Sequence, residues 1–435
     1  MMLPRRFSSP LFSLSLAFVA ASPLAACSDD SGGGDDAAIT AGSGGRPPSE
    51  TGGSGGDGGA GEPPLYAMMI QVYDTDDRTV YVYLSNTLDT GAIDLTQARE
   101  FPGVANFAPI GGRLLVSSGQ EPSISEFEIS DDFTWTDGRT VSFAAFPFED
   151  NANFYYQYIL NDRTAYMPFD TTSRLIWNPT EMTIEDTRES SSLELLRNGL
   201  TLNVGGNRNA IRYEGPVQQP FFYADDDFYE FGPESYVAIY DPQTHEETDV
   251  VTLPCPGLSM ATQDEEGYTY YGTWSFQIRA VFGEGPAPCV ARLNPDRTLD
   301  EAWTHDLADL TGGRQVNNFR YIGGGRAIGN VLHHELFEGD LESGYDPDTA
   351  LALEMSGDHW QLWMFDLETR RAQPVDGVEE AISSGAQFAV LDGRTFVFLP
   401  YDDFGRTKIY EVSSDGSAVA HADTVGDVFK WVQVR

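Results

Sequence analysis

The chain has 435 residues, with 67 Asp and Glu against 26 Lys and Arg, which gives a formal net charge of −41. Nucleic acids and anionic lipid surfaces are recognised through clustered Lys and Arg, and no such cluster follows residue 6. Hydrophobic residues make up 41% of the chain and aromatic residues 12%, which is enough for a sizeable core. The acidity therefore indicates a solubilising surface and argues against a nucleic-acid ligand.

Residues 1–26 have the pattern of a targeting segment. Arg5 and Arg6 supply a basic start, and residues 11–21 supply an apolar stretch that is too short to span a bilayer comfortably. The next four residues, Leu24-Ala25-Ala26-Cys27, resemble the bacterial lipobox. That resemblance implies cleavage before Cys27 and acylation of its new N-terminus. The alternative is an ordinary secretory cleavage site in which Cys27 is incidental.

Residues 27–64 form a predicted tether. Residues 28–64 hold 13 Gly in 37 positions, and a segment of this composition cannot bury enough apolar surface to offset its ordering entropy. As a flexible coil it has a typical reach of about 35 Å. More than one acyl chain on Cys27 would give lasting attachment to the bilayer. Ser28 lacks the aspartate that marks inner-membrane retention in enteric lipoproteins, which favours the outer membrane or cell surface.

Residues 65–435 are predicted to be an all-β domain. Runs of β-branched and aromatic residues alternate with Asp, Gly, Asn and Pro turns, and almost no helical periodicity exceeds about ten positions. The short candidates for helices are residues 193–198 and 350–354. The clearest predicted strands are residues 66–73, 80–84, 113–117, 154–160, 165–169, 268–271, 319–322 and 395–399.

A weak repeat lies over these strands, in which an apolar run ends at Asp or Asn and is followed by a turn and a polar strand. The first Asp or Asn of the six instances lies at positions 131, 178, 241, 294, 366 and 415. An Asp or Asn side chain can cap such a turn, and a following Pro presets φ. With a seventh unit at about 66–107, the repeat predicts a β-propeller of seven blades with about four strands each. Six or eight blades, or two β-sandwich domains, are the alternatives.

The last predicted strand, residues 429–434, ends one residue before the C-terminus. A propeller ring must close, and this strand is expected to pair with the first strand at 66–73 as a non-covalent latch.

Two cysteines remain once Cys27 is assigned to lipid. Cys255 and Cys289 form an even pair in a chain with an export signal, so we expect them to be bonded to each other. The alternative is a pair of free thiols.

Metal and catalytic motifs are poorly developed in this sequence. His333-His334-Glu335 lacks the second histidine that a zincin helix places four residues after the first. Asp225, Asp226 and Asp227 lack the glycine and distant glutamate of an EF-hand loop, so they are interpreted as a solvated turn. The sequence does not single out a general acid and a general base, because with 67 Asp and Glu some pair lies close in space by chance. We therefore predict no metal site, no cofactor and no enzymatic activity, with a propeller hydrolase or lactonase as an alternative.

Three segments combine aromatic residues with scarce positive charge: residues 207–213, 271–279 and 317–321. A planar anion with aromatic rings would be recognised by stacking and by charge-assisted hydrogen bonds from Arg. The segments precede strand runs, where a propeller places residues near its axial mouth. The alternative is that the aromatic side chains are inter-blade core and the arginines pair with carboxylates. The candidate ligand-binding residues are Arg212, Tyr213, Trp274, Arg279, Arg320 and Tyr321.

Beyond the lipobox and the acidic Gly-rich tether, five stretches carry a family resemblance: YAMMIQVY at 66–73, TVSFAA at 140–145, TAY at 164–166, IWNPTEM at 176–182 and APCVAR at 287–292. With them the chain is similar to the myxobacterial lipoproteins encoded with myxochelin siderophore genes. The similarity runs over most of residues 65–435. It implies a propeller-type surface lipoprotein with a non-enzymatic role, and it supplies no binding residues.

The sequence hypothesis is therefore a lipid-anchored extracytoplasmic propeller that captures or hands over a ferric catecholate siderophore. Its expected partners are the bilayer, through acylated Cys27, and an outer-membrane siderophore receptor. A ferric tris-catecholate is a trianion, so a protein with a net charge of −41 needs a locally positive site to bind it. The alternatives are a cell-surface protein-interaction scaffold and the propeller enzyme.

Overall fold

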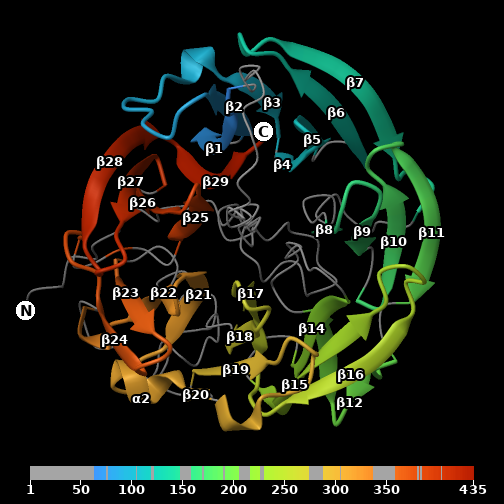
Figure 1. Cartoon of the computed structure of the whole chain (residues 1–435), viewed down its shortest axis with the longest axis vertical. Coiled ribbons are helices and arrows are strands. Elements are labelled where there is room, and N and C mark those ends of the chain that lie inside the picture. The colour runs from blue at the N-terminus through green and yellow to red at the C-terminus, as the bar shows by residue number, and fades with distance from the viewer. Residues whose placement is uncertain are drawn as a thin grey trace, which may run out of the picture.

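The computed structural model describes residues 63–74, 77–103, 105–118, 122–146, 158–168, 171–189, 192–204, 216–225, 230–273, 288–303, 305–336, 358–379, 382, 385–402 and 404–435. These residues form seven small antiparallel sheets arranged in a ring (Figure 1). The domain is a seven-bladed β-propeller, as the repeat predicted. Residues 1–62, which hold the predicted signal segment, Cys27 and all but the last two residues of the predicted tether, lie outside the described residues.

The first three blades contain four strands each. Blade 1 combines the end of the chain with its beginning, in the order β29 (Asp427–Gln433), β1 (Tyr66–Asp74), β2 (Asp77–Ser85) and β3 (Arg99–Pro102). Blade 2 contains β4 (Ala105–Ile110), β5 (Arg113–Ser118), β6 (Ser123–Ile129) and β7 (Trp135–Ser142). Blade 3 contains β8 (Tyr158–Ile159), β9 (Ala165–Pro168), β10 (Ser173–Asn178) and β11 (Thr183–Glu189).

Blade 4 has five strands, and blades 5 to 7 have four each. Blade 4 contains β12 (Leu196–Arg197), β13 (Leu200–Val204), β14 (Val217–Ala224), β15 (Phe231–Tyr240) and β16 (Glu247–Leu253). Blade 5 contains β17 (Leu258–Gln263), β18 (Thr269–Thr273), β19 (Cys289–Leu293) and β20 (His305–Asp306). Blade 6 contains β21 (Val316–Gly323), β22 (Arg326–Leu332), β23 (Trp360–Asp366) and β24 (Arg371–Pro374). Blade 7 contains β25 (Gln387–Leu391), β26 (Arg394–Tyr401), β27 (Arg406–Val412) and β28 (Ala418–Val425).

The sequence repeat corresponds to one position in the fold. Its six Asp or Asn residues fall at or just after the ends of β6, β10, β15, β19, β23 and β27, which form the hairpin with the outer strand of each blade. The side chains cap the turns as expected: Asp241 Oδ1 accepts from the backbone N–H groups of Gln243 (2.8 Å) and Thr244 (2.7 Å). Asn178 Oδ1 caps its turn in the same way. The repeat therefore marks the turn between the third and outer strands in six of the seven blades, although in the turns at 131 and 294 the capping carboxylate is the neighbouring Asp132 or Asp296.

The predicted latch is confirmed. Strand β29 pairs antiparallel with β1, with Met68 opposite Trp431. Beyond the strand ends, the N–H of Leu65 donates to the carbonyl of Arg435 (3.1 Å) and the N–H of Val434 donates to the carbonyl of Leu65 (2.7 Å). The ring is thus closed by backbone hydrogen bonds between the two ends of the domain. The segment before Leu65 leaves the propeller beside the C-terminus.

The prediction of a helix at residues 193–198 was wrong. This segment leads into β12, which pairs with β13 through a turn at Asn198 (φ 54°) and Gly199 (φ 84°). Asn-Gly adopts positive φ at both central positions of a tight hairpin turn, and this outweighs the weak helical pattern. The other candidate, 350–354, and residues 154–157 of the predicted strand at 154–160 lie outside the described residues.

Helices are few among the residues the structure describes. The α-helix α2 (Leu307–Thr311) begins where Asp306 accepts a hydrogen bond from the N–H of Ala308 and ends at Gly312, which has φ 70°. The single-turn 3-10 helices are η3 (Leu95–Gln97), η5 (Glu301–Trp303) and η6 (His334–Leu336).

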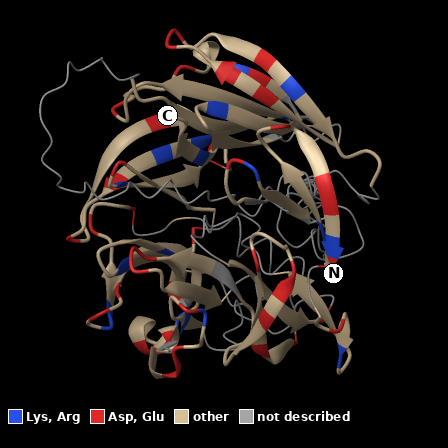
Figure 2. Cartoon of the chain, turned by 45° about the vertical axis from the view of Figure 1, so that its right-hand side comes forward, with Lys and Arg blue, Asp and Glu red and all other residues tan. Residues whose placement is uncertain are grey.

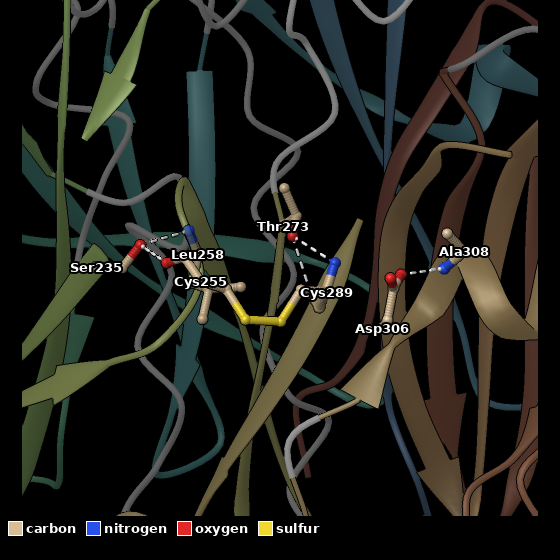
Figure 3. Close-up of a disulfide and its surroundings, with 7 residues drawn as sticks. All are labelled: Ser235, Cys255, Leu258, Thr273, Cys289, Asp306 and Ala308. Atoms are coloured by element: carbon tan, nitrogen blue, oxygen red, sulfur yellow. Dashed lines mark hydrogen bonds between the residues drawn. A yellow bond between two sulfur atoms is a disulfide. The ribbon is translucent and has the colours of Figure 1, made fainter. Parts of the chain in front are cut away.

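The predicted disulfide is also confirmed. Cys255 lies in the connection between β16 and β17, Cys289 begins β19, and the two are joined by a disulfide (Figure 3). Both cysteines are buried. Thr273 Oγ1 donates to the carbonyl of Cys289 and accepts from its N–H, and Ser235 Oγ donates to the carbonyl of Cys255. The bond thus links the connection from blade 4 to the third strand of blade 5.

Candidate functional site

The first strand of each four-stranded blade lies nearest the centre of the ring, as Figure 1 shows. These strands are β29, β4, β8, β17, β21 and β25. In the five-stranded blade 4 the corresponding strand is β13, which is followed by β14, β15 and β16 as the first strand of every other blade is followed by three more. We call these seven the axial strands. Within their described bounds they contain three charged residues: Arg320, Asp427 and Lys430. In contrast, Figure 2 shows many acidic residues on outer strands and turns. The axial strands therefore carry a net charge of +1 in a chain of −41.

Arg320 is the one predicted ligand-binding residue that the structure places as a buried cation on an axial strand. It is the fifth residue of β21, and only 8% of it is exposed. No described carboxylate or hydrogen-bond acceptor contacts its guanidinium, and burial alone lowers its pKa to about 9. Burying an unpaired charge is costly, because the protein supplies nothing in place of the lost hydration. Arg320 is therefore in the state expected of a residue whose partner is a bound anion.

Tyr321, the next residue, has different surroundings. Its ring stacks on Tyr270 of β18 with the centroids 5.8 Å apart, and its hydroxyl donates to Glu265 and accepts from the N–H of Gly325. Burial and the bond to Glu265 raise its pKa. These contacts belong to the packing between blades 5 and 6. The structure therefore separates Arg320 and Tyr321, as the alternation of side chains along a strand requires.

The other predicted site residues lie outside the described residues. They are Cys27, Arg212, Tyr213, Trp274 and Arg279. They remain predictions from the sequence.

Lys430 is a second axial cation that the sequence analysis did not select. It is one of two lysines in the chain, lies on β29 and is 5% exposed. Its Nζ donates to the carbonyl of Phe107 (2.6 Å) and to Oδ1 of Asn106 (3.1 Å), both on β4. Burial alone lowers its pKa to about 7. The signal available in the sequence was a lone lysine within an otherwise apolar stretch of the closing strand.

Strand β25 lies between the two cation-bearing strands in the ring. Its first residue, Gln387, is buried, and its Oε1 accepts no hydrogen bond within the described part of the chain. Asn318 of β21 donates from Nδ2 to the carbonyl of Ala386 (3.0 Å), which joins β21 to the start of β25. Three consecutive axial strands therefore each carry a buried polar side chain, Arg320, Gln387 and Lys430. The Nε2 of Gln387 donates to the carbonyl of Gly385, so its unbonded atom is an acceptor and not a donor for an anion.

One carboxylate accompanies these groups. Asp427 is the first residue of β29 and is 3% exposed. The axial strands thus carry two basic side chains and one carboxylate, and Arg320 is the basic group among them whose pKa, at about 9, stays above neutral pH.

Two further features of the described residues bear on the site. No group of three or more His, Cys, Asp or Glu side chains lies together where it could hold a metal ion. Within the same residues, no helix has the length and apolar character needed to cross a membrane.

Comparison with known proteins supports the fold. No protein-family model and no curated protein matches the sequence. Among solved structures, the domain is similar to a candidate 6-phosphogluconolactonase from Bacteroides uniformis, with a TM-score of 0.50 and 11% identity over 86% of this chain and 100% of that one. It is also similar to the β-propeller domains of the Pyrococcus furiosus trilobed protease (TM-score 0.43, 9% identity, 82% and 92% coverage) and of Cps50 (Swd1) from Myceliophteria thermophila (TM-score 0.44, 11% identity, 80% and 98% coverage). At these identities the likeness concerns the fold alone.

Proposed function

We propose that the protein is a lipid-anchored extracytoplasmic β-propeller that captures or hands over a small anionic ligand, and that this ligand is a ferric catecholate siderophore. The observation that carries the proposal is Arg320, a buried arginine on an axial strand without a carboxylate partner in the described residues. The ligand class is the one that the resemblance to the myxochelin-associated lipoproteins implies, and a ferric tris-catecholate, as a trianion, suits a buried arginine without a carboxylate partner.

The proposed location is supported by the sequence and by the disulfide. The lipobox-like Leu24-Ala25-Ala26-Cys27 and the Gly-rich segment after it suit a lipoprotein held away from the bilayer. Disulfides persist in oxidising compartments, so the bond between Cys255 and Cys289 supports export.

Aromatic groups near the axis suit a catecholate ligand. Trp431 follows Lys430 on β29 and is 3% exposed, and Phe107 lies under the Lys430 ammonium at 5.4 Å from its ring centroid. A change in charge at the axis would therefore alter the surroundings of a tryptophan, which gives the binding experiment its signal.

The test of ligand binding is a titration of the mature chain with ferric tris-catecholate while tryptophan fluorescence is recorded. We expect saturable quenching with a Kd below about 10 μM. Arg320→Gln should weaken binding by about tenfold or more, because a hydrogen bond to a charged group contributes about 1.5–3 kcal/mol. Arg188→Gln is the matched control, since it removes the same charge from an exposed ion pair with Asp186 on β11. Absence of saturable quenching would reject the siderophore proposal and favour the scaffold alternative.

The test of anchoring uses Cys27→Ser in a bacterial host with lipoprotein processing. The unchanged chain should incorporate a labelled fatty acid and sediment with membranes. The variant should lose the label and remain an unprocessed precursor. Equal labelling of both proteins would show that Cys27 is not the acylated residue.

A further inference from the structure

A β-bulge interrupts the axial strand β21 directly before Arg320. The register of β21 against β22 shifts between Asn317 and Arg320. Within this shift, Asn318 and Phe319 lie opposite a single residue of β22, Gly329. Bulges are common next to functional sites, because the extra residue changes the direction of the side chains that follow it.

The bulge places Arg320 on the side of β21 that faces blade 7. Arg320 pairs with Ile328, and directly opposite residues of an antiparallel pair share one face of the sheet. Ile328 belongs to the apolar cluster between blades 6 and 7. Val316 lies four positions before Arg320 in the cluster between blades 5 and 6, and a regular strand would put both residues on the same face. The extra residue therefore keeps Arg320 out of the cluster between blades 5 and 6.

Asn318 has the backbone conformation that the bulge needs. Its φ is 51°, and among the ten non-Gly residues with positive φ in the described part of the chain it is the one inside a strand. Asn adopts this left-handed conformation more readily than most residues, and β-branched residues avoid it. The N–H of Asn318 donates to Oδ1 of Asn317 (2.8 Å), and its Nδ2 donates to the carbonyl of Ala386 (3.0 Å), the residue before β25. These bonds fasten the bulge to blade 7.

Gly329 leaves room for the bulge on the partner strand. A Cβ at this position would lie 3.2 Å from the carbonyl oxygen of Asn317 and 3.4 Å from Cα of Phe319. Both are backbone atoms of β21 at the bulge, so a side chain on Gly329 would press directly on it. Both strands are therefore adapted to the same irregularity.

A strand that only packs between two blades does not need this arrangement. An apolar side chain at position 320 would fill the same space without the cost of removing a guanidinium from water. The bulge instead brings a cation to the blade 7 side of β21, where no described carboxylate pairs with it.

We propose that Asn318 is the positioning residue of the anion site at Arg320, and that the bound anion lies on the blade 7 side of β21. The proposal rests on the proposed function, because it concerns the same site. Asn318 acts through Arg320: it holds the bulge that gives the guanidinium its direction, and it need not touch the ligand.

The experiment is a calorimetric titration of the mature chain with two trianions, ferric tris-catecholate and the inert hexacyanocobaltate(III). Asn318→Val should weaken binding about tenfold, because a branched Cβ disfavours the positive φ of the bulge. Asn318→Gly keeps positive φ accessible and should bind nearly as tightly as the unchanged protein. Asn318→Ala should lie between them, and its comparison with Asn318→Gly decides the question if Asn318→Val does not fold.

Asn198→Val is the matched control for backbone strain. Asn198 has φ 54° in the exposed turn between β12 and β13 on blade 4, so the same substitution imposes the same strain away from Arg320. Its affinity for both trianions should be unchanged. An equal loss of affinity in this variant would show that the effect of Asn318→Val is a general loss of structure, and it would overturn the proposal.

The double variant Asn318→Val/Arg320→Gln tests whether Asn318 acts through Arg320. It should bind no more weakly than Arg320→Gln alone, because the group that Asn318 positions is already absent. Losses that multiply would show that the two residues act independently, and they would overturn the proposal.

The remaining outcomes separate this proposal from the proposed function. Binding that is weakened by Arg320→Gln but equal in all three Asn318 variants overturns the positioning role, while the proposed function stands. Binding of hexacyanocobaltate alone, weakened by Asn318→Val and Arg320→Gln, supports the positioning role and rejects the siderophore. Binding of neither trianion, or binding unaffected by Arg320→Gln, overturns both.

Discussion

Replacement of Lys430 by Met should change how the stability of the propeller depends on pH. The pKa of the amine is about 7 in the folded chain and 10.5 as the ordinary value. Between these two values the unfolded chain binds more protons than the folded chain, so the unchanged protein loses stability as pH falls through this window. Below pH 7 the burial penalty is fully present, and above pH 10.5 it is absent. The variant lacks this dependence.

The magnitude follows from the same pair of values. Each unit of difference corresponds to about 1.4 kcal/mol, so the burial penalty is about 5 kcal/mol at pH 6 and about 2 kcal/mol at pH 9. The unfolding free energy of the unchanged protein relative to Lys430→Met should therefore be about 3 kcal/mol lower at pH 6 than at pH 9. Methionine leaves Asn106 Oδ1 and the carbonyl of Phe107 without this donor, and that cost is the same at both pH values.

The assay is urea unfolding of both proteins at pH 6 and pH 9, followed by tryptophan fluorescence. All other ionisable groups are shared, so the difference between the two proteins isolates residue 430. Two stability profiles that run parallel within about 0.5 kcal/mol would refute the claim that Lys430 is buried without a compensating charge.

Three further substitutions test how the ring is held together. Replacing Cys255 and Cys289 by Ser should lower the unfolding free energy by about 4 kcal/mol, because the bond closes a 34-residue separation; an unchanged urea midpoint would contradict this. Trp431→Ala should cost about 3–5 kcal/mol in the same assay, since this buried ring packs on two phenylalanines of blade 7; a loss below about 1 kcal/mol would show that the latch is not stabilising. Arg174→Lys should cost about 2–3 kcal/mol, because the buried guanidinium lies 3.9 Å from the Tyr240 ring centroid and donates to two backbone carbonyls; equal thermal unfolding of both proteins would contradict this.

The distribution of charge is compatible with the proposed binding of an anion by a protein of this acidity. Its carboxylates are concentrated on turns and outer strands, where water and salt screen them within about 10 Å. The axial strands carry two cations and one carboxylate, all buried. Because screening is weaker in the interior, the local balance of charge decides what binds at the axis, and the net charge decides solubility.

Much of the architecture was predictable because it depends on local chemistry. The Asp and Asn turn caps act over two or three residues, so their spacing reveals the blades without knowledge of the fold. The disulfide and the latch followed from elimination, since two cysteines and two terminal strands were left to pair. The helix predicted at 193–198 was wrong because six residues carry too little helical periodicity to outweigh the hairpin turn at Asn198-Gly199.

The candidate site depends on contacts that no local pattern records. Lys430 meets Asn106 across 324 positions of sequence, and this contact exists only because the ring closes. Arg320 and Tyr321 are neighbours in the chain, yet one is a buried cation on an axial strand and the other packs between blades. Sequence alone indicated most of the strands and turns, because these are decided within a few residues, and it favoured seven modules without excluding six or eight. The closed ring of the structure fixes the number at seven. The tertiary structure alone decided which polar side chains are buried near the axis, because burial depends on which blades meet there.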